Sequence, residues 1–192
     1  MTEGSTADGS TAPVGRGCHA AGTGHCNDFV GFSRRLLRIL RRPLVAALIT
    51  MVPGLIGWAL GQVLLFPSLG PTALMQVHIP EHASSRPYNV IVSHTIGILA
   101  GFVSVDLFGL AAAPSVFATH TLPLTRVLAV ALAILVGTAA EVALRAQHPP
   151  AAATTLLAAL GSFRPTFREF ITVLAGVLLV ACAGEFAKRK LV

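Results

Sequence analysis

The sequence has little charge. Asp, Glu, Lys and Arg make up 11% of its 192 residues, whereas a soluble domain carries about a quarter of such residues. Apolar residues make up 54% of the chain and the mean hydropathy is +0.74. This composition excludes an ordinary soluble domain and predicts an integral membrane protein whose length suits one compact unit.

Cysteines and enzyme signatures are also scarce. With three cysteines, Cys18, Cys26 and Cys182, no disulfide framework is expected. The chain lacks a nucleophile elbow, a zinc-protease helix motif, a phosphate-binding glycine loop and a dinucleotide fingerprint. We therefore expect neither an enzyme nor a cofactor. No apolar stretch precedes residue 43, so we expect no cleaved secretory signal.

The net charge of +6 comes largely from basic residues that flank the apolar part of the chain. Such flanking charges set membrane topology and contact anionic membrane lipid, and they do not indicate nucleic-acid binding. They are Arg34, Arg35, Arg38, Arg41 and Arg42 before the first apolar run, and Lys188, Arg189 and Lys190 after the last.

The chain divides into four regions by composition. Residues 1–28 are rich in Gly and Ser and are predicted to be disordered. Residues 29–42 alternate apolar and basic positions, which is typical of an amphipathic helix on the membrane surface. Residues 43–187 form the expected transmembrane domain, and residues 188–192 are a basic C-terminal tail.

Four apolar stretches are long enough to cross a bilayer, which needs about 20 residues. Two further runs, 67–77 and 149–160, are too short and predict half-depth helices. The expected fold is therefore all-α, with four transmembrane helices and two half-helices. The predicted spans are Leu44–Phe66, Asn89–Ala112, Leu124–Leu144 and Phe170–Ala187.

Basic residues favour cytoplasmic N- and C-termini. With four spans, nine of the Lys and Arg residues near the spans fall on the side of the termini and four on the other side, Arg86, Arg145, Arg164 and Arg168. We expect the protein in the inner (plasma) membrane of a bacterium. Small residues such as Gly97, Gly101 and Gly176 permit close helix contacts, and we expect a homo-oligomer, although the same glycines could serve packing within one chain.

The two halves, about 44–112 and 124–187, resemble each other. Pro71 corresponds to Pro150, and the segment 96–101 corresponds to 171–176. Each half reads as span, short helix, span. Two spans return the chain to the same side, so we expect a tandem parallel repeat.

The most informative segment is His148-Pro149-Pro150, which separates two apolar runs. Paired prolines can begin a helix but cannot lie inside one. Irregular backbone at membrane depth must be buried in protein or line a polar path. The half-helices would favour anions at their positive N-terminal ends, or cations at their negative C-terminal ends, depending on which end meets that path.

Polar residues near the half-helices are the candidate substrate-binding residues. His94 lies inside the second span, where an ionisable group has a functional reason or a fixed partner. The alternative for His94 is a neutral core histidine, and for the loop before it a solvated surface. The set is His94, His148, Arg86, Asn89, Ser68, Thr72 and Thr154.

Cys18, His19, His25 and Cys26 form a symmetric pattern in the N-terminal region. The spacing does not match a standard zinc finger, and the flanking composition is flexible. A disordered tail without metal is the preferred interpretation, so no metal site is predicted.

The motifs HPPAAAT at 148–154 and PYNVI at 87–91 with His94 resemble the HPP family of integral membrane proteins. That family usually has Arg at the position of Tyr88 and Gly at the positions of Ser93 and Ala152. The resemblance implies four spanning helices and, because some members are associated with nitrite transport, a permease for nitrite or a similar small anion. The alternative is a non-transporting membrane sensor or scaffold whose tail binds metal or a partner.

Overall fold

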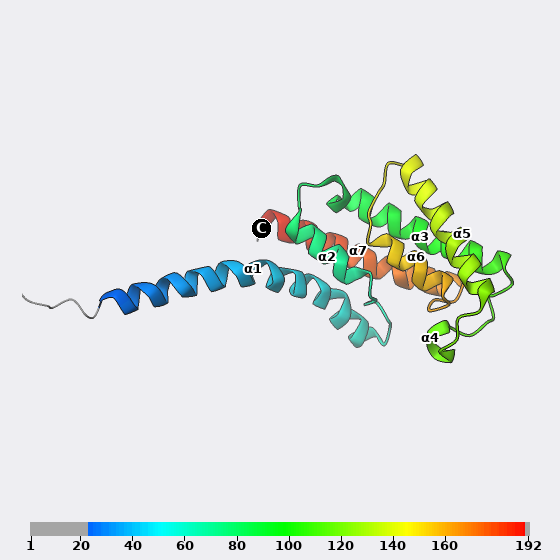
Figure 1. Ribbon diagram of the computed structural model, residues 1–192, viewed down its shortest axis with the longest axis horizontal. Coiled ribbons are helices and arrows are strands. Elements are labelled where there is room, and N and C mark those ends of the chain that lie inside the picture. The colour runs from blue at the N-terminus through cyan, green and yellow to red at the C-terminus, as the bar shows by residue number, and fades with distance from the viewer. Residues whose placement is uncertain (1–22, 191–192) are drawn as a thin grey trace, which may run out of the picture. The chain divides into compact units, whose positions relative to one another are not determined.

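The computed structural model describes residues 23–190, which fold as helices joined by short connections, without a strand in that part of the chain (Figure 1). The elements are α1 (Thr23–Leu60), α2 (Leu69–His78), the 3₁₀ turn η1 (Ala83–Ser85), α3 (Pro87–Leu107), α4 (Val116–Thr119), α5 (Leu124–Ala143), α6 (Ala151–Ala159) and α7 (Phe167–Lys190).

Helix α1 differs from the expectation at its start. It begins at Thr23 and continues to Leu60, so the boundary expected at residue 28 and a separate helix over 29–42 are not seen. The chain divides into two compact units, Met1–Arg38 and Ile39–Val192. Pro43 lies inside the helix close to this division, where it removes the hydrogen bond to the carbonyl of Ile39.

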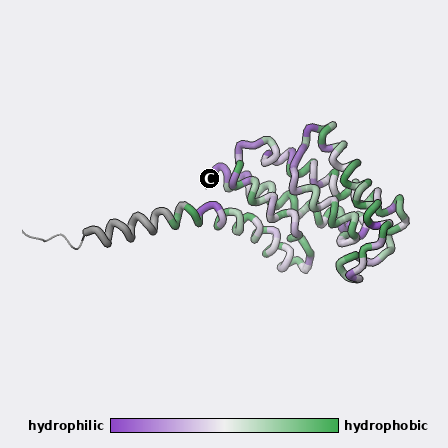
Figure 2. Tube along the Cα trace, viewed as in Figure 1, coloured by the Kyte–Doolittle hydropathy of each residue, from purple (hydrophilic) through white to green (hydrophobic). Residues whose placement is uncertain are grey.

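Four helices are long and apolar enough to cross a membrane, as the sequence predicted. They comprise Ile39–Leu60, Pro87–Leu107, Leu124–Ala143 and Phe167–Lys190. Pro87 at the first turn starts the second span because its fixed φ suits a helix and no backbone donor is lost there. Figure 2 shows these helices as mainly hydrophobic, with hydrophilic residues gathered at connections and helix ends.

Hydrogen bonds within the second unit define two ends of the bundle. At the first end, Lys188 of α7 donates to the carbonyl of Ser85, just before α3. The Tyr88 hydroxyl at the start of α3 donates to the carbonyl of Leu144, just after α5, at 3.2 Å. The first end therefore gathers the start of α3 with the ends of α2, α5 and α7.

The second end gathers the opposite termini. Arg168 in the first turn of α7 donates to the Gln62 side chain, just after α1, at 3.2 Å. Arg126 at the start of α5 donates to the carbonyl of Ala159, the last residue of α6, at 3.1 Å, and to Ala113, beyond α3, at 3.1 Å. The ends of α1, α3 and α6 thus lie with the starts of α5 and α7.

Two passes between these ends each consist of an irregular segment followed by a short helix. Helix α2 has 10 residues and α6 has 9, which at about 1.5 Å per residue cover roughly half of a 30 Å hydrocarbon layer. Irregular segments, 61–68 before α2 and 144–150 before α6, cover the other half. The chain therefore passes between the two ends six times, three times in each half.

This arrangement contradicts the expected parallel repeat. Each half does have the order span, short helix, span. However, α3 and α7, the third elements of the two halves, pack together and run antiparallel. In each half, the irregular segment and the half-helix together make one further pass, so each half has three. After three passes the chain is at the opposite end, and the corresponding elements of the second half therefore run in the opposite direction. The prediction was wrong because it treated the short helices as segments that return to their own side.

Each half-helix packs on the last span of the other half. Helix α6 contacts α3 and α2 contacts α7. Gly97 and Gly101 of α3 face the residues of α6, and Gly184 of α7 faces Gln76 of α2. Gly176 faces the backbone of Leu64, so these glycines serve packing within one chain and give no support to the expected homo-oligomer, which stays a prediction.

Candidate functional site

Three polar side chains lie on one face of α2. Ser68 precedes the first turn, and Thr72 and Gln76 follow at four-residue steps, which places them above one another on a helix. All three are fully buried. These three side chains form a polar row within the apolar core.

The row on α2 meets two histidines and a threonine from the other half-helix and α3. The Thr72 hydroxyl lies 3.1 Å from Nε2 of His94 and 3.0 Å from Nε2 of His148. The Thr154 hydroxyl of α6 lies 2.7 Å from Nδ1 of His94 and 2.7 Å from the Ser68 hydroxyl. Nδ1 of His148 lies 2.7 Å from the carbonyl of Ser84. We call Ser68, Thr72, His94, His148 and Thr154 the polar network.

Both half-helices direct their N-terminal ends toward this network. Ser68 is the residue before the first turn of α2, and His148 lies two residues before Pro150, the corresponding residue of α6. The two helices leave the network toward opposite ends of the bundle. Because the N-terminal end of a helix carries partial positive charge, the network is surrounded by a potential that favours an anion. This resolves which helix end meets the polar site.

Neighbouring polar groups hold the His-Pro-Pro segment against α3. Asn89 donates from Nδ2 to the carbonyl of Gln147 at 3.2 Å, and the Ser93 hydroxyl donates to the carbonyl of Ala146. Both side chains are buried. They satisfy backbone carbonyls of an irregular segment that otherwise would have no partner in an apolar surrounding, and so they fix the position of His148.

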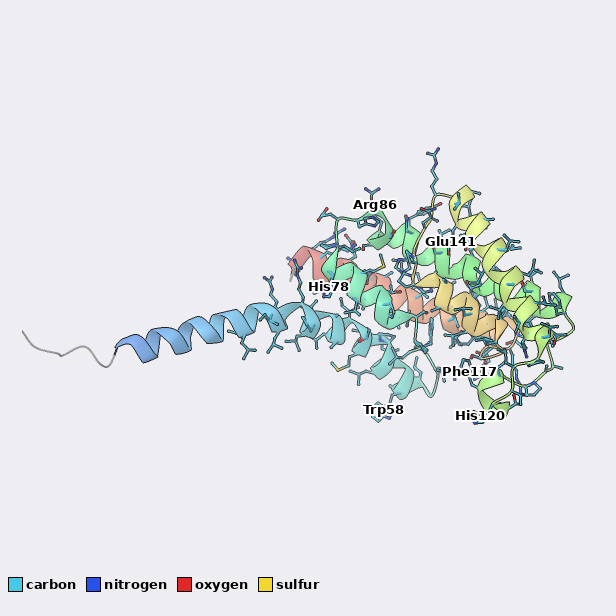
Figure 3. All side chains as sticks on the ribbon, in the orientation of Figure 1. Trp58, His78, Arg86, Phe117, His120 and Glu141 are labelled. Atoms are coloured by element: carbon cyan, nitrogen blue, oxygen red, sulfur yellow. The ribbon has the colours of Figure 1, made fainter. Side chains whose placement is uncertain are left out.

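Arg86 lies apart from the polar network. It is exposed at the first end of the bundle, just before α3 (Figure 3). Of the seven residues singled out in the sequence, five form the polar network, Asn89 supports it, and Arg86 lies at the surface. Its predicted contact with substrate stays a prediction.

Two buried polar residues, Gln76 beside the polar network and Arg126 at the second end, were missed by the sequence analysis. Both side-chain polar atoms of Gln76 are buried without a hydrogen-bond partner. Its spacing from Ser68 and Thr72 is the signal that could have identified it. The second residue, Arg126, is 1% exposed and donates to carbonyls of Ala159, Leu110, Ala113 and Pro114. No periodic pattern distinguishes it from a basic residue that flanks a span.

A cavity of about 520 Å³ lies at the second end of the bundle, beside the start of α5. Arg126 and Arg164 line it together with Ser115, Ser162 and Glu169. Two arginines against one carboxylate give this cavity a positive balance among its charged lining residues. It provides space for small solutes at the end where α6 terminates.

Metal ligands do not gather in the described residues, which contain no group of three or more His, Cys, Asp and Glu side chains placed to hold an ion. Of the N-terminal pattern, Cys18 and His19 lie outside the described residues, as do the side chains of His25 and Cys26.

A family model for the HPP transmembrane region matches residues 32–190. No curated protein and no solved structure matches the chain. The family match covers all four membrane spans, both half-helices and every residue of the polar network. The chain therefore belongs to the HPP family of multi-pass membrane proteins.

Proposed function

We propose that this protein transports a small inorganic anion, preferably nitrite, across the membrane of a bacterium. One observation carries the proposal: the N-terminal ends of two half-helices converge on a buried network of hydroxyl and imidazole groups. Helix N-termini and neutral donors suit a monovalent anion, since they stabilise negative charge without a permanent cation that would hold it too tightly.

Arginines at both ends of the bundle support a path for an anion between those ends. Arg126 and Arg164 line the cavity at the second end, and Arg86 is exposed at the first end. Cationic entrances raise the local concentration of an anion. Between them, the path passes the polar network, where Ser68, Thr72 and Thr154 donate through their hydroxyls and His94 and His148 through their rings.

The row on α2 continues this path toward the first end. Gln76 lies one turn beyond Thr72 and has an amide with no protein partner. An unpaired buried amide costs about 1–3 kcal/mol, and such a cost is tolerated where the group has a use. We assign to it the donation of a hydrogen bond to the anion as it leaves the polar network.

Nitrite uptake into proteoliposomes tests the proposal. Uptake should exceed that of protein-free liposomes. Thr154→Val should reduce the protein-dependent rate at least tenfold because it removes a hydroxyl that joins Ser68 and His94. Thr95→Val is the matched control: it lies on α3 beside His94, but its hydroxyl bonds only the carbonyl of Ile91 in its own helix. Absence of protein-dependent uptake by the parent protein would reject transport in favour of a non-transporting membrane sensor or scaffold. Parent-level uptake in Thr154→Val would reject the polar network as the path.

A further inference from the structure

The polar network lacks a permanent positive charge. Arg86 is exposed at the first end, and Arg126 is held by backbone carbonyls at the second. An anion buried among neutral groups carries a large desolvation cost unless a counter-charge accompanies it. Within the network, the imidazoles of His94 and His148 are the groups that can become positive.

One set of directions gives each of the five bonds of the polar network a proton when both rings are neutral. The Ser84 carbonyl can only accept, so Nδ1 of His148 carries a proton and donates to it at 2.7 Å. Nε2 of His148 then accepts from the Thr72 hydroxyl, which accepts in turn from Nε2 of His94. Nδ1 of His94 accepts from Thr154, whose oxygen accepts from Ser68. Each of the five bonds then holds one proton and runs in one direction.

A second arrangement exists because Thr72 has another acceptor. Its hydroxyl lies 2.9 Å from the Ser68 carbonyl. If a proton binds Nε2 of His148, the Thr72 hydroxyl turns its own proton to that carbonyl and its oxygen accepts from both histidines. No hydrogen bond is lost, and the tautomer of His94 is unchanged. The network can therefore take up one proton at His148 and return it by the reverse rotation.

The closeness of the two histidine rings limits the network to one additional proton, and two charged groups lie near them. The rings of His94 and His148 are 5.3 Å apart between centroids, so two imidazolium charges would repel each other. From α7, Lys188 binds the carbonyl of Ser85, next to the Ser84 carbonyl that holds His148. From α5, Glu141 interacts with Ser93, one residue before His94. Thr72 and Gln76 face the region from α2 and do not titrate.

We infer that the protein carries one proton with each anion, loaded on Nε2 of His148 and switched by the Thr72 hydroxyl. This inference rests on the proposed anion transport and names its coupling ion. The imidazolium of His148 and a monovalent anion such as nitrite form a neutral pair, so the anion occupies the buried network without uncompensated charge. When the anion is released on the far side of the membrane, the proton leaves Nε2 of His148 for water on the same side, and the Thr72 hydroxyl turns its own proton back to His148.

The test uses proteoliposomes that contain a pH-sensitive dye and are supplied with nitrite, with protein-free liposomes as the blank for permeation by nitrous acid. Internal acidification should accompany protein-dependent uptake at one proton per nitrite. An imposed inside-positive potential should leave the uptake rate unchanged, and a fall of one unit in external pH should raise subsaturating uptake up to tenfold. Thr72→Val should lose at least tenfold of the uptake and its pH dependence. Thr72→Ser should keep one proton per nitrite and the pH dependence, whatever its rate, and the control Thr95→Val should retain both the rate and the pH dependence.

The outcomes separate the two proposals. Nitrite uptake without acidification, accelerated by an inside-positive potential, would refute proton coupling and leave anion transport intact. Absence of protein-dependent uptake would refute both. If Thr72→Val does not fold, Thr72→Ser with unchanged coupling supports the hydroxyl switch, and Thr72→Ser with pH-independent uptake rejects it.

Discussion

At the residue scale, the buried polar groups of the network are hydroxyls and imidazoles, which carry no permanent charge. Each side chain of the polar network has a hydrogen-bond partner, so the network is stable as a neutral group in an apolar surrounding. Gln76 departs from this rule because its buried amide has none.

The histidines should matter more for transport than for folding. His94→Ala and His148→Ala should each lower nitrite uptake at least tenfold, equivalent to about 1.4 kcal/mol in the barrier, while the purified proteins stay monodisperse in detergent. Gln at either position should restore part of the rate if neutral hydrogen bonding suffices. At His148, proton coupling predicts little rescue. Parent-level uptake in both Ala variants would exclude the polar network as the site, and aggregation of both would show a structural role.

Gln76→Leu should separate stability from activity. Leu has a similar size and removes the two unpaired polar atoms, so thermal unfolding in detergent should shift upward by the equivalent of about 1–3 kcal/mol. Nitrite uptake should fall because the donor beyond Thr72 is lost. Unfolding curves and uptake rates measured on the same preparations test this, and a variant that is less stable yet fully active would contradict it.

At the element scale, two broken helices are held in place by glycines and by one arginine. The glycines of α3 let α6 approach closely, and those of α7 do the same for α2 and the segment before it. The C-terminal end of α6 carries partial negative charge, and the guanidinium of Arg126 binds there. These contacts decide where the N-terminal ends of the half-helices lie, and therefore where the polar network forms.

A larger side chain at a glycine of α3 should weaken the packing of α6 against α3. A Cβ at Gly101 would overlap the side chain of Ala158 and press on the carbonyl of Thr155 at 3.2 Å. Gly101→Ala should therefore destabilise the protein by about 1–3 kcal/mol. Gly70→Ala is the matched control: it lies within α2 with open space around it and should be neutral or stabilising by up to about 1 kcal/mol. Thermal unfolding of both variants decides, and equal effects would refute the packing argument.

Removing Arg126 should release the end of α6. Arg126→Ala leaves several buried carbonyls without their charged donor, so the loss should be at least about 1.5–3 kcal/mol. Arg126→Lys should be intermediate, since an ammonium group cannot reproduce the planar set of donors. Protease resistance of the connection between α6 and α7 reports the release. Unchanged resistance in Arg126→Ala would show that the arginine serves the cavity alone.

At the scale of the whole molecule, six passes place different connections on the same side of the membrane than the expected four passes do. Among the residues of the second unit, seven basic residues belong to the first end: Arg41, Arg42, Arg86, Arg145 and the three C-terminal residues. Three belong to the second end, Arg126, Arg164 and Arg168. With four passes the same ten residues divide six to four. Six passes therefore give the larger imbalance, which favours a cytoplasmic first end.

Cysteine labelling distinguishes the six-pass from the four-pass topology. In a variant without native cysteines, single cysteines at Glu81 and Arg145 should be protected from an impermeant reagent in intact cells, together with one at Lys190. A cysteine at Arg164 should react from outside. The four-pass topology instead exposes positions 81 and 145 to the outside, so labelling of those two positions in intact cells would overturn the arrangement.

The sequence by itself determined the membrane class, the four spans and the two short helices, because composition and the length of apolar runs report directly on burial in lipid. It also singled out the five residues of the polar network, since ionisable and hydroxyl groups beside prolines are conspicuous in apolar segments. Only the tertiary structure decided that the short helices complete passes and do not return, because a 10-residue helix has the same sequence signature in either case. The choice of which spans pack together likewise decides the position of Gln76 and the contacts of Arg126. It also decides that each half-helix packs on the last span of the other half. That choice rests on glycine contacts between residues far apart in the chain, which no local pattern encodes.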